Sequence, residues 1–206
     1  MKNNFILILI SFLIFYIKIS NSFAEELRFE ASSIEIIDKD KIVIAKEGVK
    51  ILSGDKIVID ANQMKYNKEE KFLKASGNIK ITNQIDNIEI ISDDIIYDKK
   101  AEKIISSGNV EIKFEDNYLL NTKEIIYLKN SGEILINHIS KIKDNLGNEI
   151  EFEQLEFNSI DKLIKGKTVK LIDLEKNFYN FESAIVDFSK NQIIADNVSI
   201  DFNKNI

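Results

Sequence analysis

The sequence predicts an all-β protein made of about six stacked hairpin-like repeats. Three observations support this prediction. Two segments nearly superimpose at a spacing of 31 residues, and a repeat of this length is typical of one supersecondary unit stacked on copies of itself. Many short runs alternate apolar and polar residues with a period of two, as half-buried strands do. No long stretch after residue 24 has the 3.6-residue period of an amphipathic helix.

The first 24 residues have the features of a secretory signal peptide. Lys2 gives a positive start, an unbroken apolar run covers residues 5–17, and Ser22 and Ala24 place small residues just before a cleavage site. A membrane-spanning helix needs about 20 apolar residues, so an uncleaved anchor is the weaker interpretation. We expect export, cleavage after Ala24 and one mature domain of residues 25–206.

Strand-like runs and polar turns alternate through this mature domain. The clearest runs cover residues 41–45, 56–59, 78–82, 110–114 and 198–202. Turn segments lie between such runs, at residues 38–40, 67–70, 98–100, 130–132 and 189–191. No proline occurs, and no linker-like segment marks a second domain.

Each repeat combines a strand that contains a Tyr, a polar turn, and a returning strand with a Gly-Asn pair. The first copy covers residues 60–81 and the second covers residues 91–112, so that Tyr66 and Tyr97 are 31 positions apart. Gly-Asn permits a left-handed or bulged step. Two short strands joined at such a step can carry the chain from one sheet to an opposing sheet.

The repeat decays toward both ends, as terminal units of a stack do. Tyr127, Phe157 and Phe188 continue the aromatic position at spacings of 30, 30 and 31 residues, whereas His138 replaces Gly in the third unit. Because a single unit cannot bury its apolar face alone, we expect function to belong to the surface of the stack rather than to one catalytic cluster.

Composition argues against several classes of function. Removal of residues 1–24 changes the formal net charge from −6 to −8, which argues against nucleic acid as a partner. The absence of Cys excludes disulfides and thiolate chemistry. His138, the only histidine, is expected on the surface, and the acidic pairs Glu69-Glu70 and Asp93-Asp94 are expected in solvent. We therefore expect no enzyme activity, no metal site and no cofactor.

The repeat resembles a known family. The pattern Asp-Ala-x-x-Met-x-Tyr, polar turn, Leu-x-Ala-x-Gly-Asn-Ile-x-Ile at residues 60–81, repeated at 91–112, resembles the OstA-like domain of lipopolysaccharide transport. That family includes a small periplasmic bridge protein and the N-terminal periplasmic part of a large outer-membrane assembly protein. The resemblance covers roughly residues 25–202 and implies an open antiparallel β-jellyroll, in which two sheets form a V around an apolar groove.

The resemblance also implies a function and partners. Such a domain carries the acyl chains of lipopolysaccharide across the periplasm to the outer membrane, with which it is associated, and joins other β-jellyroll proteins of the pathway by edge-strand pairing. We expect recurring apolar positions to line the groove: Met64, Tyr66, Ile79, Ile81, Ile95, Tyr97, Ile104, Val110, Ile112, Ile125 and Tyr127. The same side chains would also suit an ordinary closed core.

Two alternatives remain open from the sequence. A polysaccharide-binding or enzymatic β-solenoid would also be repetitive, although its repeats are expected to be shorter. The chain is expected to be either a complete bridge protein or the N-terminal part of a larger assembly protein. The start of the first repeat so soon after the signal peptide slightly favours the second.

Overall fold

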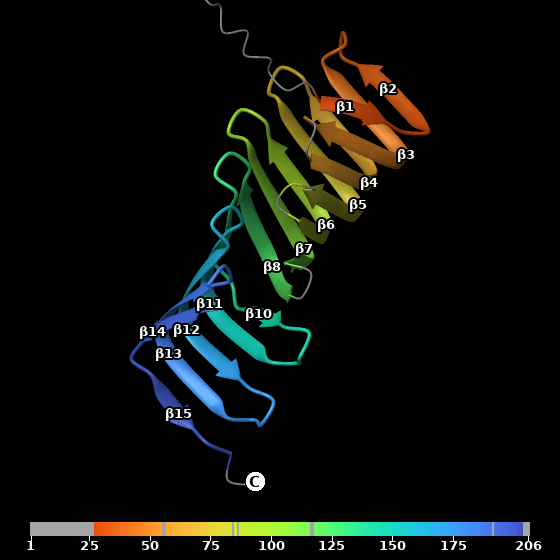
Figure 1. Cartoon of the computed structure of the whole chain (residues 1–206). Helices are drawn as coiled ribbons and strands as arrows, with labels where there is room; N and C mark the ends of the chain where they lie inside the picture. The colour runs from red at the N-terminus through yellow and green to blue at the C-terminus, as the bar shows by residue number, and fades with distance from the viewer. Residues whose placement is uncertain are drawn as a thin grey trace, which may run out of the picture.

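The computed structural model describes residues 27–54, 57–83, 85, 87–115, 118–190 and 192–203. Every secondary-structure element within these ranges is a β-strand, and the strands form one antiparallel sheet (Figure 1). The predicted all-β fold is confirmed. In the same ranges no helix has the length and apolar character needed to cross a membrane. The predicted signal peptide, residues 1–24, lies outside the described residues.

Fifteen strands make up the described sheet. The N-terminal group is β1 (Leu27–Glu30), β2 (Ser33–Ile37), β3 (Ile42–Ser53), β4 (Ile57–Asn67), β5 (Phe72–Asn83), β6 (Ile88–Asp98), β7 (Lys103–Phe114) and β8 (Tyr118–Leu128). The C-terminal group is β9 (Glu133–Ile136), β10 (Ser140–Lys143), β11 (Glu149–Asn158), β12 (Leu163–Ile172), β13 (Phe178–Asp187), β14 (Gln192–Asp196) and β15 (Ser199–Asp201).

The sheet is a meander in which strands pair in chain order. Three strand positions are split in two: β1 and β2 both pair with β3, β9 and β10 both lie between β8 and β11, and β14 and β15 both pair with β13. If each split pair counts as one strand, twelve strands remain in the described part, which corresponds to the six hairpin-like units expected. The pairs β1/β2 and β14/β15 lie at opposite ends of the molecule (Figure 1).

Short polar turns join the hairpins where the sequence places them. Asn67, Asp98 and Asn158 each end a strand and accept hydrogen bonds from the two backbone N–H groups that lie two and three residues later. Such Asx turns reverse the chain without help from the core. The polar residues of the repeat therefore fix the hairpin ends, while the apolar residues determine which face is buried.

Bulges in the middle of the strands explain the Gly-Asn pairs. The register shifts between Ser76 and Ile79 in the β5–β6 pairing and between Ser107 and Val110 in the β7–β8 pairing. At the second of these bulges, Asp93 of the neighbouring strand accepts a hydrogen bond from the backbone N–H of Asn109, 2.9 Å away. The predicted strands were shorter than those observed, because each strand runs through its bulge instead of stopping there.

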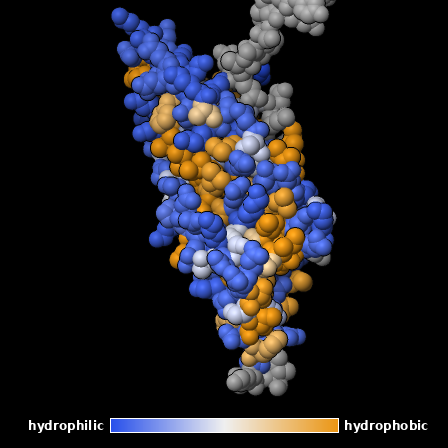
Figure 2. All heavy atoms as spheres, turned by 90° about the vertical axis from the view of Figure 1, so that its left-hand side faces the viewer, coloured by the Kyte–Doolittle hydropathy of each residue, from blue (hydrophilic) through white to orange (hydrophobic). Residues whose placement is uncertain are grey.

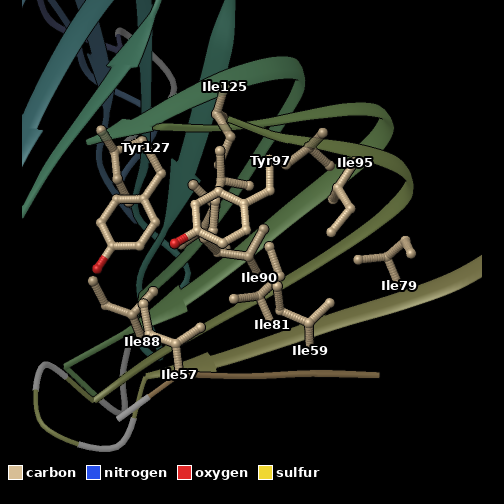
Figure 3. Close-up of a cluster of buried hydrophobic side chains, with 14 of the residues drawn as sticks. Ile57, Ile59, Ile79, Ile81, Ile88, Ile90, Ile95, Tyr97, Ile125 and Tyr127 are labelled. Atoms are coloured by element: carbon tan, nitrogen blue, oxygen red, sulfur yellow. The ribbon is translucent and has the colours of Figure 1, made fainter. Parts of the chain in front are cut away.

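The sheet folds over at these bulges, so that its two halves face each other. We call the half that holds Tyr66, Tyr97 and Tyr127 the tyrosine half, and the other the opposite half. Figure 3 shows Tyr97 and Tyr127 above isoleucines of the opposite half such as Ile88. A single cluster of buried apolar side chains fills the space between the halves. The two predicted sheets are therefore halves of one continuous sheet.

Candidate functional site

All eleven residues predicted to line a groove lie in the buried cluster between the two halves. None is more than 9% exposed. The tyrosine half supplies Met64, Tyr66, Ile95, Tyr97, Ile104, Ile125 and Tyr127, and the opposite half supplies Ile79, Ile81, Val110 and Ile112. The structure thus brings the predicted residues together on one continuous inner face. Their contact with a lipid stays a prediction.

The apolar interior extends further than the prediction. Residues of strands β3, β4, β6, β7 and β8 to β12 continue the same inner face: Ala45, Ile51, Ile59, Ile88, Ile90, Phe114, Leu120, Ile134, Ile136, Ile142, Phe152, Leu155, Phe157, Ile164 and Val169. Several of these lie in period-two runs of the sequence, such as Ile57-Val58-Ile59 and Ile88-Glu89-Ile90. Counting alternate residues on both sides of each bulge would have found them.

At both edge strands, no described residue covers the apolar interior. Ile36 of β2 lies opposite buried Val43, so it faces the interior, yet it is 52% exposed. At the other edge, Ile193 of β14 lies opposite buried Val186 and is 49% exposed. Figure 2 shows hydrophobic surface in patches along the length of the molecule. Apolar inner surface therefore continues to both ends of the sheet.

The free ends of the two halves meet along a line that we call the seam. One side is formed by the strand ends at Ser53, Asn83 and Glu115, and the other by residues at and beyond the ends of β6, β8 and β11. The contacts that cross it include Ser53 with Tyr97, Asn83 with Tyr127 at 3.0 Å, and Glu115 with Lys162 at 3.0 Å. The residues in each pair are 44 or more positions apart, so these contacts hold the fold in its doubled-over form.

A four-residue polar cluster closes the first part of the seam, and we call it the latch. The Lys129 ammonium donates hydrogen bonds to Ser53 Oγ and the Tyr97 hydroxyl, both at 2.9 Å, and to Glu102 Oε2 at 2.8 Å. The Tyr97 hydroxyl also lies 2.7 Å from Glu102 Oε2 and 3.2 Å from Ser53 Oγ. The three N–H groups of Lys129 match these three oxygen acceptors.

Burial and pairing shift the pKa values of two latch residues. Burial raises the pKa of Tyr97 above its ordinary value. Burial also acts to lower the pKa of Lys129, but hydrogen bonds to Glu102 and Tyr97 outweigh it and raise the pKa. Both shifts favour the protonated forms. At neutral pH the latch is therefore a cationic Lys129, a neutral Tyr97 and their oxygen partners.

Reasoning from the sequence missed the latch and the other seam contacts. The aromatic repeat placed Tyr97 and Tyr127 on the inner face, but it did not show which strand ends they would meet. Ser53 and Asn83 close strands β3 and β5, 30 residues apart, at the same position of successive repeats. A polar residue at the last inward position of a strand is the signal that could have identified them.

A hollow of about 660 Å³ lies beside these contacts, and polar groups from both sides of the seam line it. They include Ser53, Asn83, Glu115, Lys129, Ser159 and Lys162. Hydroxyl, amide, ammonium and carboxylate groups thus gather where the apolar interior reaches the surface. The hollow has the mixed polar character of a site at the mouth of an apolar groove.

His138 is exposed, as expected, and it interrupts a strand. The third repeat has Asn137, His138 and Ile139 where the earlier repeats carry a Gly-Asn bulge, and these residues separate β9 from β10. The described residues contain no group of three or more His, Cys, Asp or Glu that could hold a metal ion.

The fold has counterparts among solved protein structures. No protein-family profile and no curated protein matches the chain. Among solved structures, the chain is similar to LptH from Pseudomonas aeruginosa, which is described as the LptA-homologous periplasmic component of that organism's conserved lipopolysaccharide transport device. The two share 14% sequence identity with a TM-score of 0.45, over 50% of this chain and 76% of LptH.

Proposed function

We propose that this protein binds the acyl chains of lipopolysaccharide between the two halves of its sheet and passes the lipid on without chemistry. The observation that carries the proposal is the apolar inner face, which runs from β2 to β14 and is uncapped by described residues at both edges. The resemblance of the repeat at residues 60–81 and 91–112 to the OstA-like domain supports the same function.

Binding would depend mainly on burial of hydrocarbon. Each CH₂ group removed from water contributes about 0.8 kcal/mol, so one acyl chain supplies a large driving force without any charged contact. Affinity should therefore change little when sodium chloride is raised to moderate concentrations, because screening weakens interactions between exposed charges and does not act on the burial of hydrocarbon.

Transfer to a partner would use the edge strands. Strands β2 and β14 each have one described neighbour, β3 and β13 respectively. Unpaired strand edges pair readily with a strand of another chain, and pairing here would join two inner faces end to end. Within the proposal, the partners are other β-jellyroll proteins of lipopolysaccharide transport, and the site of action is the periplasm at the outer membrane.

The parallel β-solenoid considered from the sequence does not fit the fold. Every pairing between described strands is antiparallel and follows the meander order. A solenoid needs parallel strands stacked turn upon turn. Polysaccharide binding by such a solenoid is therefore a weaker explanation of the repeat than an apolar groove.

Site-specific photo-crosslinking in cells tests the proposal. A photo-reactive residue in place of Ile36 should crosslink to lipopolysaccharide, whereas one at neighbouring Glu35, on the other face of the same strand, should not. Ile95 and Ile112 should also crosslink, in contrast to the turn residue Lys100. Equal labelling at inner and outer positions, or none at all in folded variants, would mean that the inner face is an ordinary core.

A further inference from the structure

We propose that the seam is the entrance through which acyl chains reach the interior, and that Ser53, Tyr97, Glu102 and Lys129 form a latch that must open first. This inference rests on the proposed function and adds a route and a control point to it. The two uncapped edges offer the competing route, in which a chain slides in lengthwise and the seam stays shut.

The packed interior makes an opening step necessary. The large side chains Tyr97, Tyr127, Ile81 and Ile90 are all less than 2% exposed, and they meet across the space between the halves (Figure 3). Protein interiors packed in this way leave little room for additional atoms. An acyl chain can lie between the halves only if they separate, and the seam is where their free ends meet.

The contacts across the seam are of a kind that can break and re-form. In the described residues they are hydrogen bonds, the Glu115–Lys162 ion pair and aromatic contacts such as Phe114–Phe157, whose ring centroids are 4.8 Å apart. The other folded side of the interior is the continuous backbone of the strands at their bulges. The halves can therefore part at the seam while they remain hinged at the bulges.

The latch divides unequally between the two sides of the seam. Tyr97, Glu102 and Lys129 belong to the tyrosine half, and only Ser53 belongs to the opposite half. Opening here separates Ser53 from Lys129 and Tyr97, but it leaves the Lys129–Glu102 ion pair at 2.8 Å intact. Lys129 and Glu102 therefore keep each other as partners when Ser53 moves away, which makes this step less costly than the rupture of that ion pair would be.

The hollow at the seam indicates which chemistry would accompany the chains. Once Ser53 has moved away, hydroxyl or phosphate oxygens of a lipid head group can take its place beside Lys129. Ser159 and Lys162 line the same hollow. The chains of an amphiphile would lie inside, and its oxygen-rich head group would remain at the mouth.

Reversible cross-linking across the seam tests this entrance. The chain contains no Cys, so Glu115→Cys with Lys162→Cys introduces two unique thiols on opposite sides of the seam. A short bis-maleimide with a central disulfide can join them and later be cut by a reductant. The matched control is Lys141→Cys with Glu151→Cys, which replaces another Lys–Glu ion pair, between register neighbours on β10 and β11.

We expect the cross-linked seam variant to take up fluorescent lipopolysaccharide at least ten times more slowly than its uncross-linked form, and to recover when the linker is cut. The cross-linked control should keep its rate. Ser53→Ala should accelerate the uptake of lipopolysaccharide several-fold, because it removes one side of the latch. Ser183→Ala, which removes an exposed hydrogen bond to Asp196, should leave the rate of uptake unchanged.

Uptake that is equally fast with the seam cross-linked would overturn the proposal and favour entry at the edges. A single-chain fluorescent fatty acid, used in parallel, separates the two levels of inference. If the unmodified protein binds the fatty acid but not lipopolysaccharide, and cross-linking blocks the fatty acid, the entrance stands and the proposed function fails. If both lipids bind and neither is blocked, the function stands and the entrance fails.

Discussion

The side-chain amide of Asn83 donates a hydrogen bond to the hydroxyl of Tyr127, 3.0 Å away across the seam and 44 positions later in the chain. The preceding repeat places Ser53 against Tyr97 at the same separation of 44. The following repeat places Phe114 against Phe157, 43 positions later, as a ring contact. Polar meets polar in two repeats and apolar meets apolar in the third, so the two sides of the seam are chemically matched.

A double-mutant cycle measures this match. Tyr127→Phe and Asn83→Leu should each reduce the free energy of unfolding by about 1–3 kcal/mol, because each leaves a buried polar group without this partner. The double variant should lose less than the sum of the two, since it resembles the Phe114–Phe157 pair. Urea unfolding gives all four values, and strictly additive losses would mean that the contact contributes nothing.

The ion pair of the latch should be far more important for stability than an exposed pair of the same type. The side chains of Lys129 and Glu102 are 9% and 23% exposed, whereas those of Lys41 and Glu69 are 41% and 62% exposed. Lys129→Met should reduce the free energy of unfolding by about 2–4 kcal/mol, because it leaves the partly buried carboxylate of Glu102 without this partner. Lys41→Met should cost less than about 1 kcal/mol.

The Lys129→Met variant also permits a rescue experiment. Adding Glu102→Gln removes the stranded charge and should restore part of the lost stability. Thermal unfolding at neutral pH is a sufficient measurement. If Lys129→Met and Lys41→Met reduce the stability equally, the Lys129–Glu102 pair is not buried in solution and the seam is open.

The Gly of the Gly-Asn pair is predicted to be irreplaceable where a side chain of the neighbouring strand lies against it. Gly108 has φ of +99°, and a Cβ there would lie 2.6 Å from Cβ of Asp93. Gly48 has φ of +73°, but a Cβ there would meet nothing within 4 Å. Gly108→Ala should cost about 2–4 kcal/mol, from backbone strain and overlap together, and Gly48→Ala about 1–2 kcal/mol from strain alone.

Urea denaturation distinguishes these two glycines. Adding Asp93→Ala to Gly108→Ala should recover part of the loss, since it shortens the side chain that the new Cβ would touch. Equal losses at Gly48 and Gly108 would show that the bulge can move aside. The motif would then reflect backbone conformation only.

Acid should weaken the C-terminal hairpin. Hydrogen bonds from Lys190 and Ser189 lower the pKa of the Asp187 carboxyl to about 2. Because the folded pKa is below that of the unfolded chain, this contribution to stability is complete above about pH 4. It is lost as the pH falls toward 2. Lys190→Met should raise the pKa of Asp187, as followed by NMR titration, and an unchanged titration would refute the pairing.

The sequence predicted the inner face well, because its information is local and periodic. Burial of Tyr97 follows from its place in a period-two run, and the Asx turn at Asp98 follows from the residue type. Both features depend on neighbours within a few positions. The same reasoning placed all eleven proposed lining residues on the inner face, although it could not decide whether a lipid ever touches them.

The seam could not be predicted in the same way. Ser53 and Lys129 are 76 positions apart and occupy no shared repeat position, so their contact depends on how far the folded sheet twists along its length. Strand continuity was missed for a related reason. A Gly such as Gly108 is compatible with either a strand end or a bulge. The contact of this bulge with the Asp93 side chain, which distinguishes the two, exists only in the folded structure.

Alkaline pH should loosen the latch. Burial raises the pKa of Tyr97, and its hydrogen bonds raise that of Lys129. A folded pKa above the unfolded value means that the stabilisation is complete below about pH 10, near the unfolded pKa of both groups. It is lost as the pH rises through the folded values. Tyr97→Phe should therefore be less stable than the unmodified protein at pH 8 but lose less stability on the way to pH 11.

The phenolate absorbance of Tyr97, taken as the difference between the protein and Tyr97→Phe, gives the titration directly. Tyr179→Phe is the matched control, because Tyr179 also donates to a carboxylate, that of Asp173 at 3.0 Å, but is not part of the latch. If the entrance works as proposed, uptake of the fluorescent fatty acid should accelerate over the same alkaline range in the unmodified protein and in Tyr179→Phe. In Tyr97→Phe it should be faster at neutral pH and should increase less over the alkaline range, because only Lys129 is left to titrate.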